Sequence, residues 1–442
     1  MKIFINLIIV ICSLSLHTFA QKKEKKDKRR INIERSPEQA LVYSDHDYLP
    51  YIKSVQFYPN AQEQTIPMLS LNSDDKLFLS FDDLRADNRT FYYTIEHCSF
   101  DWKSSNLSTL EYIEGVTEDR IFDYKSSMNT LQAYTHYQLS FPNEGSMIPK
   151  LSGNYLLKVY EDADKSRLIL TRKFYVYRQE VGLDIKTLPS FDVSKRKQNQ
   201  KLNVEVSLEQ LNINNPYQDI KVVVKQNRRD DMQEVLSKPM FVKEDQLIYN
   251  NNKTLDFDGG NEFHNLDIRS FRLLSGQIQN SVKDSLRKLI LIPDQDLSTE
   301  TYSFSFDEDG EYFIRNNDFE DSEVEGDYAN IAFTLKTPPP SKGEKIYIVG
   351  LFNNFEATNE NEMVYDLQGG VWKGVLKLKQ GLYHYTYKCI DENGKVLVNK
   401  YNGHHFETGN TYDVFTYYRK PATRWDELVG YGTVKTAVNE RR

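Results

Sequence analysis

The sequence predicts an all-β fold made of three tandem β-sandwiches of the immunoglobulin-like or early-set-like kind. Aromatic residues make up 13% of the 442 residues, with 29 tyrosines and 24 phenylalanines against three tryptophans. Such side chains are favoured on pleated, half-buried surfaces. Short alternating segments also recur along the chain with turn residues between them, which is typical of sandwich domains.

The N-terminus has the pattern of a cleaved signal peptide over residues 1–20. A lysine precedes the short apolar run Ile3–Leu16, and small residues lie near its exit, ending in Ala20. This order is typical of secretory signals, and the run is too short to span a bilayer as a helix. We therefore expect cleavage after Ala20, export, and no integral membrane segment. Residues 21–44 are rich in charge and are expected to form a flexible leader.

The first sandwich is expected over residues 45–180. Its alternating segments are Tyr51–Pro59, Lys76–Leu84, Phe91–Ile95, Tyr134–Phe141, Tyr155–Tyr160 and Leu168–Val176. Alternation of this kind predicts strands with one face buried and one face toward solvent.

The second sandwich is expected over residues 181–337, the third over 341–420, and a tail over 421–442. Strands of the second are expected at Lys201–Leu208, Ile220–Lys225, Leu289–Ile292, Tyr302–Phe306 and Ala329–Leu335; those of the third are expected at Lys345–Gly350, Val371–Leu378 and Leu382–Lys388. Three prolines, Pro338–Pro340, predict a stiff linker between these domains. The tail, with Leu428 and Val429, is expected to dock as a short amphipathic piece.

Charge and cysteine content limit the possible functions. The net charge of −8 disfavours nucleic acid as a partner, because phosphate binding needs a basic surface. After removal of the signal peptide two cysteines remain, Cys98 and Cys389, in different expected domains. Two separately buried thiols are the favoured interpretation, and a disulfide between domains remains as the alternative.

The residues that could carry chemistry do not form a convincing catalytic set. His97 and Cys98 are neighbours on an expected strand, where side chains diverge, so they suit a thiol nucleophile and its base poorly. The same argument holds for Asp82 and Asp83, which we expect to be solvated. We therefore predict a non-enzymatic protein with no catalytic residue, bound metal or cofactor.

Seven residues are instead candidates for structural or interaction roles. His97, Asp101 and Trp102 are expected to fix the corner after a strand through hydrogen bonds. His136 could approach His97 if their two strands pair. The full set is His97, Asp101, Trp102, Tyr134, His136, Phe355 and Trp372.

The order of several motifs resembles the N-terminal domain of the type IX secretion system plug family of Bacteroidota. The matching runs are Leu79–Leu84, Tyr92–Trp102, Glu111–Gly115, Asn129–Thr130, Tyr134–Tyr137, Phe141–Asn143 and Ser152–Leu157. Further likeness follows at Gly259–Phe263, Leu378–Tyr385, Glu407–Tyr412 and Tyr417–Arg419. The resemblance implies a periplasmic protein at the inner face of the outer membrane. Such a protein would bind the translocon barrel and seal its periplasmic opening through contact area and shape.

The third expected domain resembles early-set sandwiches that bind glycogen or starch. The likeness lies in Ile348–Phe355, Trp372 and Gly381–Tyr383. Those modules usually carry tryptophan where this chain has Phe355, so the substitution favours a retained fold without a sugar site. A carbohydrate-binding accessory role in the cell envelope, acting through Trp372, is the alternative function.

Overall fold

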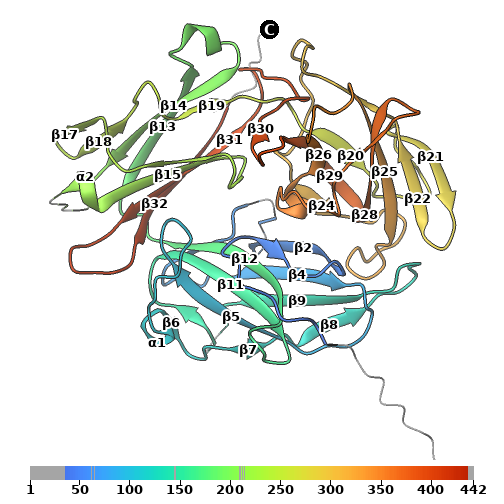
Figure 1. Ribbon diagram of the computed structural model, residues 1–442. Helices are drawn as coiled ribbons and strands as arrows, with labels where there is room; N and C mark the ends of the chain where they lie inside the picture. Colours follow the sequence, from blue (N-terminus) through green and yellow to red (C-terminus); the bar gives the residue numbers. More distant parts are fainter. Residues whose placement is uncertain are drawn as a thin grey trace, which may run out of the picture. The chain divides into compact units, whose positions relative to one another are not determined.

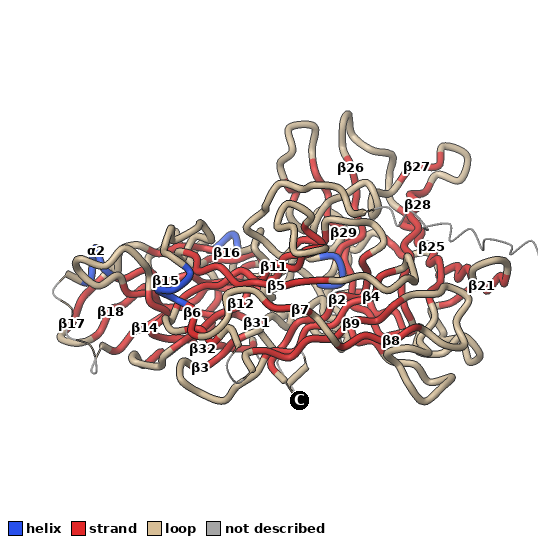
Figure 2. The backbone as a smooth tube through the Cα atoms, turned by 90° about the horizontal axis from the view of Figure 1, so that it is seen from below, coloured by secondary structure: helices blue, strands red, loops and turns tan. Residues whose placement is uncertain are grey.

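Strands dominate the structure, and helix is limited to single turns (Figure 1; Figure 2). The computed structural model describes residues 35–60, 62–63, 65–143, 146–208, 211, 213 and 215–436. The expected signal peptide and most of the leader lie outside the described residues. The short helical turns are α1 (Thr109–Tyr112), α2 (Pro216–Asp219), η1 (Val193–Lys195) and η2 (Leu351–Asn353). The all-β prediction is confirmed, with the strands arranged in several mainly antiparallel sheets.

The first sheet pair comprises two facing sheets from residues 46–177. One sheet has the order β1 (His46–Asp47), β12 (Leu168–Tyr177), β11 (Gly153–Glu161), β5 (Phe91–Cys98) and β7 (Asp119–Arg120), with β3 (Met68–Ser70) added in parallel to β12. The other has the order β2 (Ile52–Pro59), β4 (Leu77–Asp83), β9 (Thr135–Phe141) and β8 (Asp123–Ser126). A small ribbon joins β6 (Ile113–Glu114) to β10 (Ile148–Pro149).

The two sheets of the first pair enclose one hydrophobic core rich in aromatic rings. Phe81 stacks on Tyr137 from neighbouring strands, and Phe91 meets Tyr137 edge-on from the opposite sheet. Because side chains alternate along each strand, the aromatic residues that are two positions apart reach the same core. The aromatic richness seen in the sequence is therefore used mainly for packing between sheets.

The second sheet pair takes strands from two distant parts of the chain. One sheet has the order β13 (Gly182–Pro189), β14 (Asn199–Ser207), β18 (Gln246–Tyr249) and β17 (Phe241–Lys243), with β19 (Asp256–Asp258) also on β14. The other has the order β16 (Gln233–Leu236), β15 (Ile220–Gln226), β31 (Thr411–Tyr418) and β32 (Glu427–Lys435). In Figure 1 the red strand β31 lies beside green β15, as the register of Ile220 opposite Tyr418 requires, and β32 pairs with the other edge of β31.

The strands of the third sheet pair lie, in sequence, between the two parts of the chain that form the second sheet pair. Its inner strand β29 (Gly381–Ile390) pairs with β20 (His264–Asp267), β24 (Tyr312–Ile314), β26 (Lys345–Val349) and β30 (Val396–Leu397). The facing sheet has the order β21 (Ile278–Lys283), β22 (Arg287–Leu291), β25 (Tyr328–Lys336), β28 (Val371–Lys379) and β27 (Val364–Asp366), with β23 (Asp294–Gln295) on β25.

The observed organisation differs from the expected boundaries in three ways. The strands at 264–336 belong with the third sheet pair, and the segment 411–435 returns to the second. The expected tail forms strand β32, and Leu428 and Val429 within it are fully buried. The physical reason is that strand pairing joins segments of any sequence separation, which a local alternating pattern does not reveal.

Two local expectations are also corrected. Packing begins before residue 45, because Ser36 is buried and its backbone N–H donates to Glu161 Oε2 at 2.7 Å. The segment Tyr302–Phe306, expected as a strand, has no strand pairing, and its Phe304 and Phe306 are exposed. Serine and phenylalanine alternate there, but no neighbouring strand satisfies the backbone, so the alternation does not produce a sheet strand.

We expect Leu428→Ala to lower the free energy of unfolding by about 2–5 kcal/mol. The truncation leaves a cavity at a fully buried position in the cluster where sheet pairs meet. Leu273→Ala is the matched control: this leucine is 83% exposed, so its truncation should change stability by less than about 0.5 kcal/mol. Urea unfolding followed by tyrosine fluorescence measures both. Equal stability of the two variants would contradict the packed role of β32.

Candidate functional site

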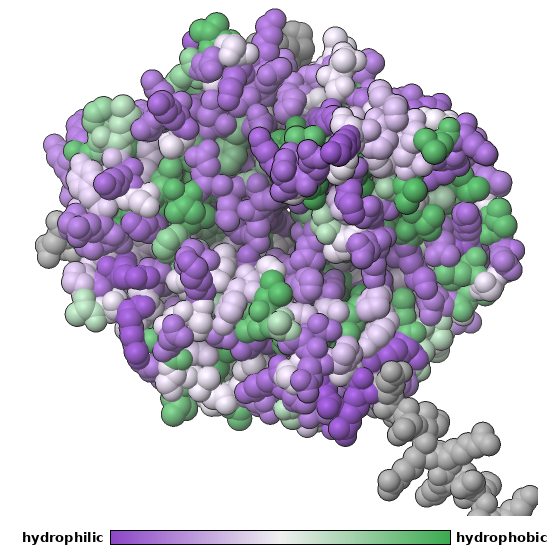
Figure 3. All heavy atoms as spheres, viewed as in Figure 1, coloured by the Kyte–Doolittle hydropathy of each residue, from purple (hydrophilic) through white to green (hydrophobic). Residues whose placement is uncertain are grey.

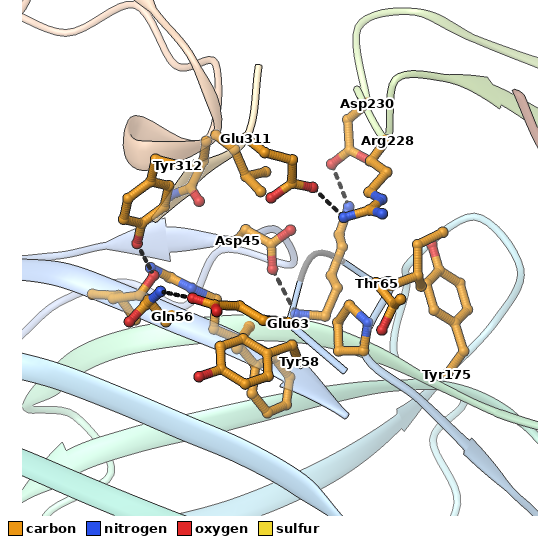
Figure 4. A pocket seen from close by; sticks show the side chains of 18 of the residues that line it. Asp45, Gln56, Tyr58, Glu63, Thr65, Tyr175, Arg228, Asp230, Glu311 and Tyr312 are labelled. Atoms are coloured by element: carbon orange, nitrogen blue, oxygen red, sulfur yellow. Dashed lines mark hydrogen bonds and ion pairs between the residues drawn. The ribbon is translucent and has the colours of Figure 1, made fainter. Parts of the chain in front are cut away.

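The three sheet pairs meet around a cavity of about 110 Å³ (Figure 4). The first pair contributes Asp45 and the segment around Gln56, the second contributes Lys225 and Asp230, and the third contributes Glu311 and its neighbour Tyr312. Because each pair supplies a wall, the arrangement of this cavity depends on how the pairs are held together. The contacts at their junctions are therefore the candidate functional site.

Asp230 links the first and second sheet pairs. Its two carboxylate oxygens accept hydrogen bonds from Lys173 Nζ at 2.5 Å and Lys225 Nζ at 2.7 Å. Partial desolvation acts to raise the pKa of Asp230, whose side chain is 42% exposed, but the ammonium groups of the buried Lys225 and Lys173 outweigh it and hold the pKa well below the usual range. The aspartate is therefore ionised and joins a lysine of β12 to a lysine of β15.

Aromatic packing reinforces the same junction. Tyr175 of β12 stacks on Phe415 of β31 with ring centroids 4.5 Å apart, and the Trp102 indole meets Tyr175 edge-on at 5.3 Å. Lys173 Nζ lies 4.5 Å from the centroid of the Trp102 ring, and the electron-rich ring face attracts the ammonium group. Trp102 is thus a buried part of the junction between the first and second sheet pairs.

A buried ion pair joins the first and third sheet pairs. Asp82 at the end of β4 accepts from Lys379 Nζ at 2.8 Å, from the Tyr328 hydroxyl at 2.6 Å, and lies 2.6 Å from His136 Nδ1. Burial acts to raise the pKa of Asp82, but Lys379 and the His136 hydrogen bond hold it below its usual value. This corrects the expectation that Asp82 and Asp83 are solvated, because both side chains are fully buried.

Tyr134 and His136 lie on the same side of their extended segment and face the third sheet pair together. The Tyr134 hydroxyl is within hydrogen-bond distance of two backbone carbonyl oxygens, those of Glu323 at 2.9 Å and Gly326 at 2.8 Å. Lys379 Nζ lies 4.2 Å from the centroid of the Tyr134 ring. The structure therefore brings these two sequence candidates together with Asp82 and Lys379.

Asp101 takes part in a hydrogen-bonded corner after the strand, as expected, whereas His97 packs in the interior beside it. The Asp101 carboxylate accepts from Ser99 Oγ and Lys103 Nζ, both at 2.6 Å, and lies at an exposed turn. His97 is buried edge-on against Tyr155, and burial lowers its pKa to about 4. His97 is therefore neutral at neutral pH and acts as a packing residue.

The close packing of His97 explains the glycine in the Ser-Gly-Asn run of the plug-like motif. Gly153 has φ of +145°, and a Cβ atom there would lie 2.5 Å from His97 Nε2 and 2.9 Å from the Asp426 carbonyl oxygen. A side chain at this position would collide with both the ring and the backbone of the second sheet pair.

Phe355 and Trp372 do not present ring faces to solvent. Phe355 packs against Phe263 and lies under the Arg229 guanidinium, whose carbon is 4.9 Å from the ring centroid. Trp372 lies in the core of the third sheet pair and donates from Nε1 to the Pro338 carbonyl oxygen at 3.2 Å. A sugar-binding aromatic must expose a face for stacking, so neither ring is available for the carbohydrate role.

The two cysteines have free thiols and lie in different hydrophobic clusters. Burial raises the pKa of both, to about 12 for Cys389, so neither is an activated thiolate. Within the described part of the chain, no group of three or more His, Cys, Asp or Glu side chains is placed to hold a metal ion. No helix among the described residues is long and apolar enough to cross a membrane.

Asp82 and Lys379 are not predicted from the sequence as a functional pair. The two residues are 297 positions apart, and neither lies in a pattern that marks a buried charge. Lys379 is the last residue of β28 and directly precedes the Gln380-Gly381 step into β29. Asp82 and Lys379 each lie in a run that resembles the plug family, Leu79–Leu84 and Leu378–Tyr385, and these runs were the available indication.

We expect Asp82→Asn to lower the free energy of unfolding at pH 7 by about 3–5 kcal/mol, because it leaves Lys379 buried without its partner. The folded-state pKa of Asp82 is lowered, so its contribution is present above the unfolded pKa of about 4 and is lost as pH falls. The difference from wild type should therefore shrink between pH 7 and pH 3 in urea unfolding experiments.

Asp101→Asn is the matched control for that experiment. Asp101 pairs with an exposed lysine, and exposed pairs contribute at most about 1 kcal/mol. If Asp82→Asn lowers the free energy of unfolding no more than Asp101→Asn does, a stabilising role for the buried pair is contradicted.

Comparisons with known proteins place the first sheet pair in a family. Residues 52–178 match the model of the type 9 secretion system plug protein first domain. A hypothetical protein from Parabacteroides merdae ATCC 43184, solved at 2.30 Å resolution, aligns over 90% of this chain and 100% of its own, with 27% identity and a TM-score of 0.85. No curated protein matches the sequence. Residues 52–178 thus match the first domain of the type 9 secretion system plug protein family, and the likeness to the solved hypothetical protein extends over 90% of this chain.

Proposed function

We propose that this protein is a non-enzymatic, periplasmic component of the type IX secretion system. It binds the outer-membrane translocon barrel and seals the periplasmic opening of that barrel when no substrate occupies it. The observation that carries the proposal is the family match over residues 52–178, which covers most of the first sheet pair. Export through the N-terminal signal of the sequence is consistent with a periplasmic location.

The junctions support a sealing role on physical grounds. A stopper must keep its shape under the fluctuations of a neighbouring pore, so hinge motion between its parts is unfavourable. Here the first sheet pair is joined to the second through Asp230 and to the third through Asp82, and both carboxylates are bonded to lysine. Opening either junction would leave buried charges unpaired, which is costly.

The surface composition also fits a partner that is released. On the face seen in Figure 3, hydrophilic residues predominate and hydrophobic residues form small separate groups. Interfaces that form and dissociate are about as apolar as the rest of a protein surface, whereas permanent ones are more apolar. A face of this composition can cover an opening and leave it without exposing a large hydrophobic area.

Binding of carbohydrate is not favoured as a second function. Trp372, through which sugar binding was expected to act, is buried within the fold, and Phe355 is buried as well.

Deletion of the gene should make the outer membrane permeable to large antibiotics such as vancomycin. The reason is that an unsealed secretion barrel is a water-filled path. The measurement is the minimal inhibitory concentration of vancomycin, which should fall in the deletion strain and recover when the wild-type gene is supplied.

A strain that lacks both this gene and the gene for the translocon barrel is the control. Its permeability should equal that of the wild type, because no open barrel remains. Unchanged sensitivity in the single deletion, or sensitivity that persists without the barrel, would contradict the proposed sealing role.

A further inference from the structure

One edge of strand β28 lacks a partner strand for most of its length. Along one side, β28 pairs with β25 from Trp372 to Lys379. Along the other side, β27 pairs only with Val371–Lys373. Among the described residues, no strand pairs with Gly374–Lys379 on that side. Backbone N–H and C=O groups on such an edge are available for pairing with another extended chain.

A groove of about 340 Å³ runs beside this edge. Five consecutive residues of β28, Val375–Lys379, line it. Side chains alternate along a strand, so a cavity above one face would be lined by every second residue. Lining by consecutive residues means that the groove reaches the edge of the strand. Asn330 of β25 and the loop residues Thr358 and Glu360 line it as well, so it also extends over the adjoining sheet face.

The opposite wall of the groove comes from the first sheet pair. It consists of Pro50, Lys53, Ser54 and Leu84, while Tyr312 and Tyr383 also line the groove. The junction between the first and third sheet pairs therefore sets the width of the groove. A free strand edge faces a fixed wall, which is the geometry that accepts a single extended segment.

The charges in the groove distinguish one lysine from the others. Lys53 Nζ is paired with Glu360 at 2.6 Å, and Lys379 Nζ is paired with Asp82 at 2.8 Å. Lys377 Nζ donates to a neutral acceptor, Gln132 Oε1, at 3.0 Å. Within the described residues no carboxylate is paired with Lys377, so its charge is complementary to an acidic group from outside.

Val375 supplies an apolar contact on the same side of the strand. It is 51% exposed and lies two residues before Lys377, so both side chains point to the same face of β28. A segment paired with this edge places its own alternate residues opposite these two. An apolar residue opposite Val375 and an acidic residue opposite Lys377 are therefore two positions apart in that segment.

We propose that the free edge of β28 binds an extended segment of a partner protein as an added strand. The segment carries an apolar residue and a carboxylate two positions apart. Backbone pairing with Gly374–Lys379 supplies affinity, while Val375 and Lys377 select the side chains. This proposal rests on the strand edge and its groove and does not depend on the sealing role.

The test uses a fluorescein-labelled hexapeptide of the sequence Thr-Val-Thr-Glu-Thr-Thr with blocked ends, titrated with the full chain by fluorescence anisotropy. We expect saturable binding. Two further versions are N-methylated at the odd or at the even amides. Alternate amides of a paired strand point to the partner, so one version should lose binding and the other should retain it. Absence of saturable binding, or equal binding of both methylated versions, would overturn the proposal.

A charge reversal tests the side-chain selection. Lys377→Glu should weaken binding of the glutamate peptide by about five- to tenfold, as expected when a partly exposed attraction becomes a repulsion. A peptide with lysine in place of that glutamate should bind this variant better than it binds the wild type.

Lys288→Glu is the matched control, since Lys288 lies on β22 of the same sheet and is separated from β28 by β25. It should leave the affinity for both peptides unchanged. Equal effects of the Lys377→Glu and Lys288→Glu variants would show that only net charge matters and would refute selection by Lys377. If the peptide binds but antibiotic sensitivity is unchanged in the deletion strain, the proposed strand-binding groove is supported and the proposed sealing role is contradicted.

Discussion

The structure depends on buried charges that are satisfied only when all three sheet pairs are in place. The buried Asp82, on the first pair, faces the buried Lys379 on the third, and the buried Lys173, on the first, faces the partly exposed Asp230 on the second. A single buried charge is strongly unfavourable, but a hydrogen-bonded pair is tolerated. A buried charge on one sheet pair is therefore stabilised by an oppositely charged group on another sheet pair. This requirement favours one relative arrangement over other packings of the same sheets.

Rigid junctions and an available strand edge are compatible within one molecule. The wall opposite the β28 edge belongs to the first sheet pair, and the Asp82–Lys379 pair lies at the end of the same strand. The ion pair thus holds the groove at a defined width, while the edge itself keeps unpaired backbone groups. Native proteins usually cover or interrupt such edges. An uncovered edge beside a fixed wall is therefore suited to recognition of an extended partner.

Local chemistry explains why some sequence candidates proved structural. The His97 ring is buried against Tyr155, and this burial keeps it neutral. Trp372 alternates inward on β28 and fills the core of the third sheet pair. Burial gives both residues packing roles. Asp82 was assigned to solvent because carboxylates are usually exposed, and the lysine that makes its burial possible lies far away in sequence.

The amino-acid sequence by itself determined the all-β class and most strand positions, because alternation and turn residues are local properties of the chain. It also contained the ordered motifs of the plug family across the first sheet pair. Tertiary structure decided which strands pair, as when β31 and β32 return to β15 after the whole third sheet pair. It also decided which charges meet and which edge stays free. These features depend on contacts between residues hundreds of positions apart, for which a single sequence carries no local pattern.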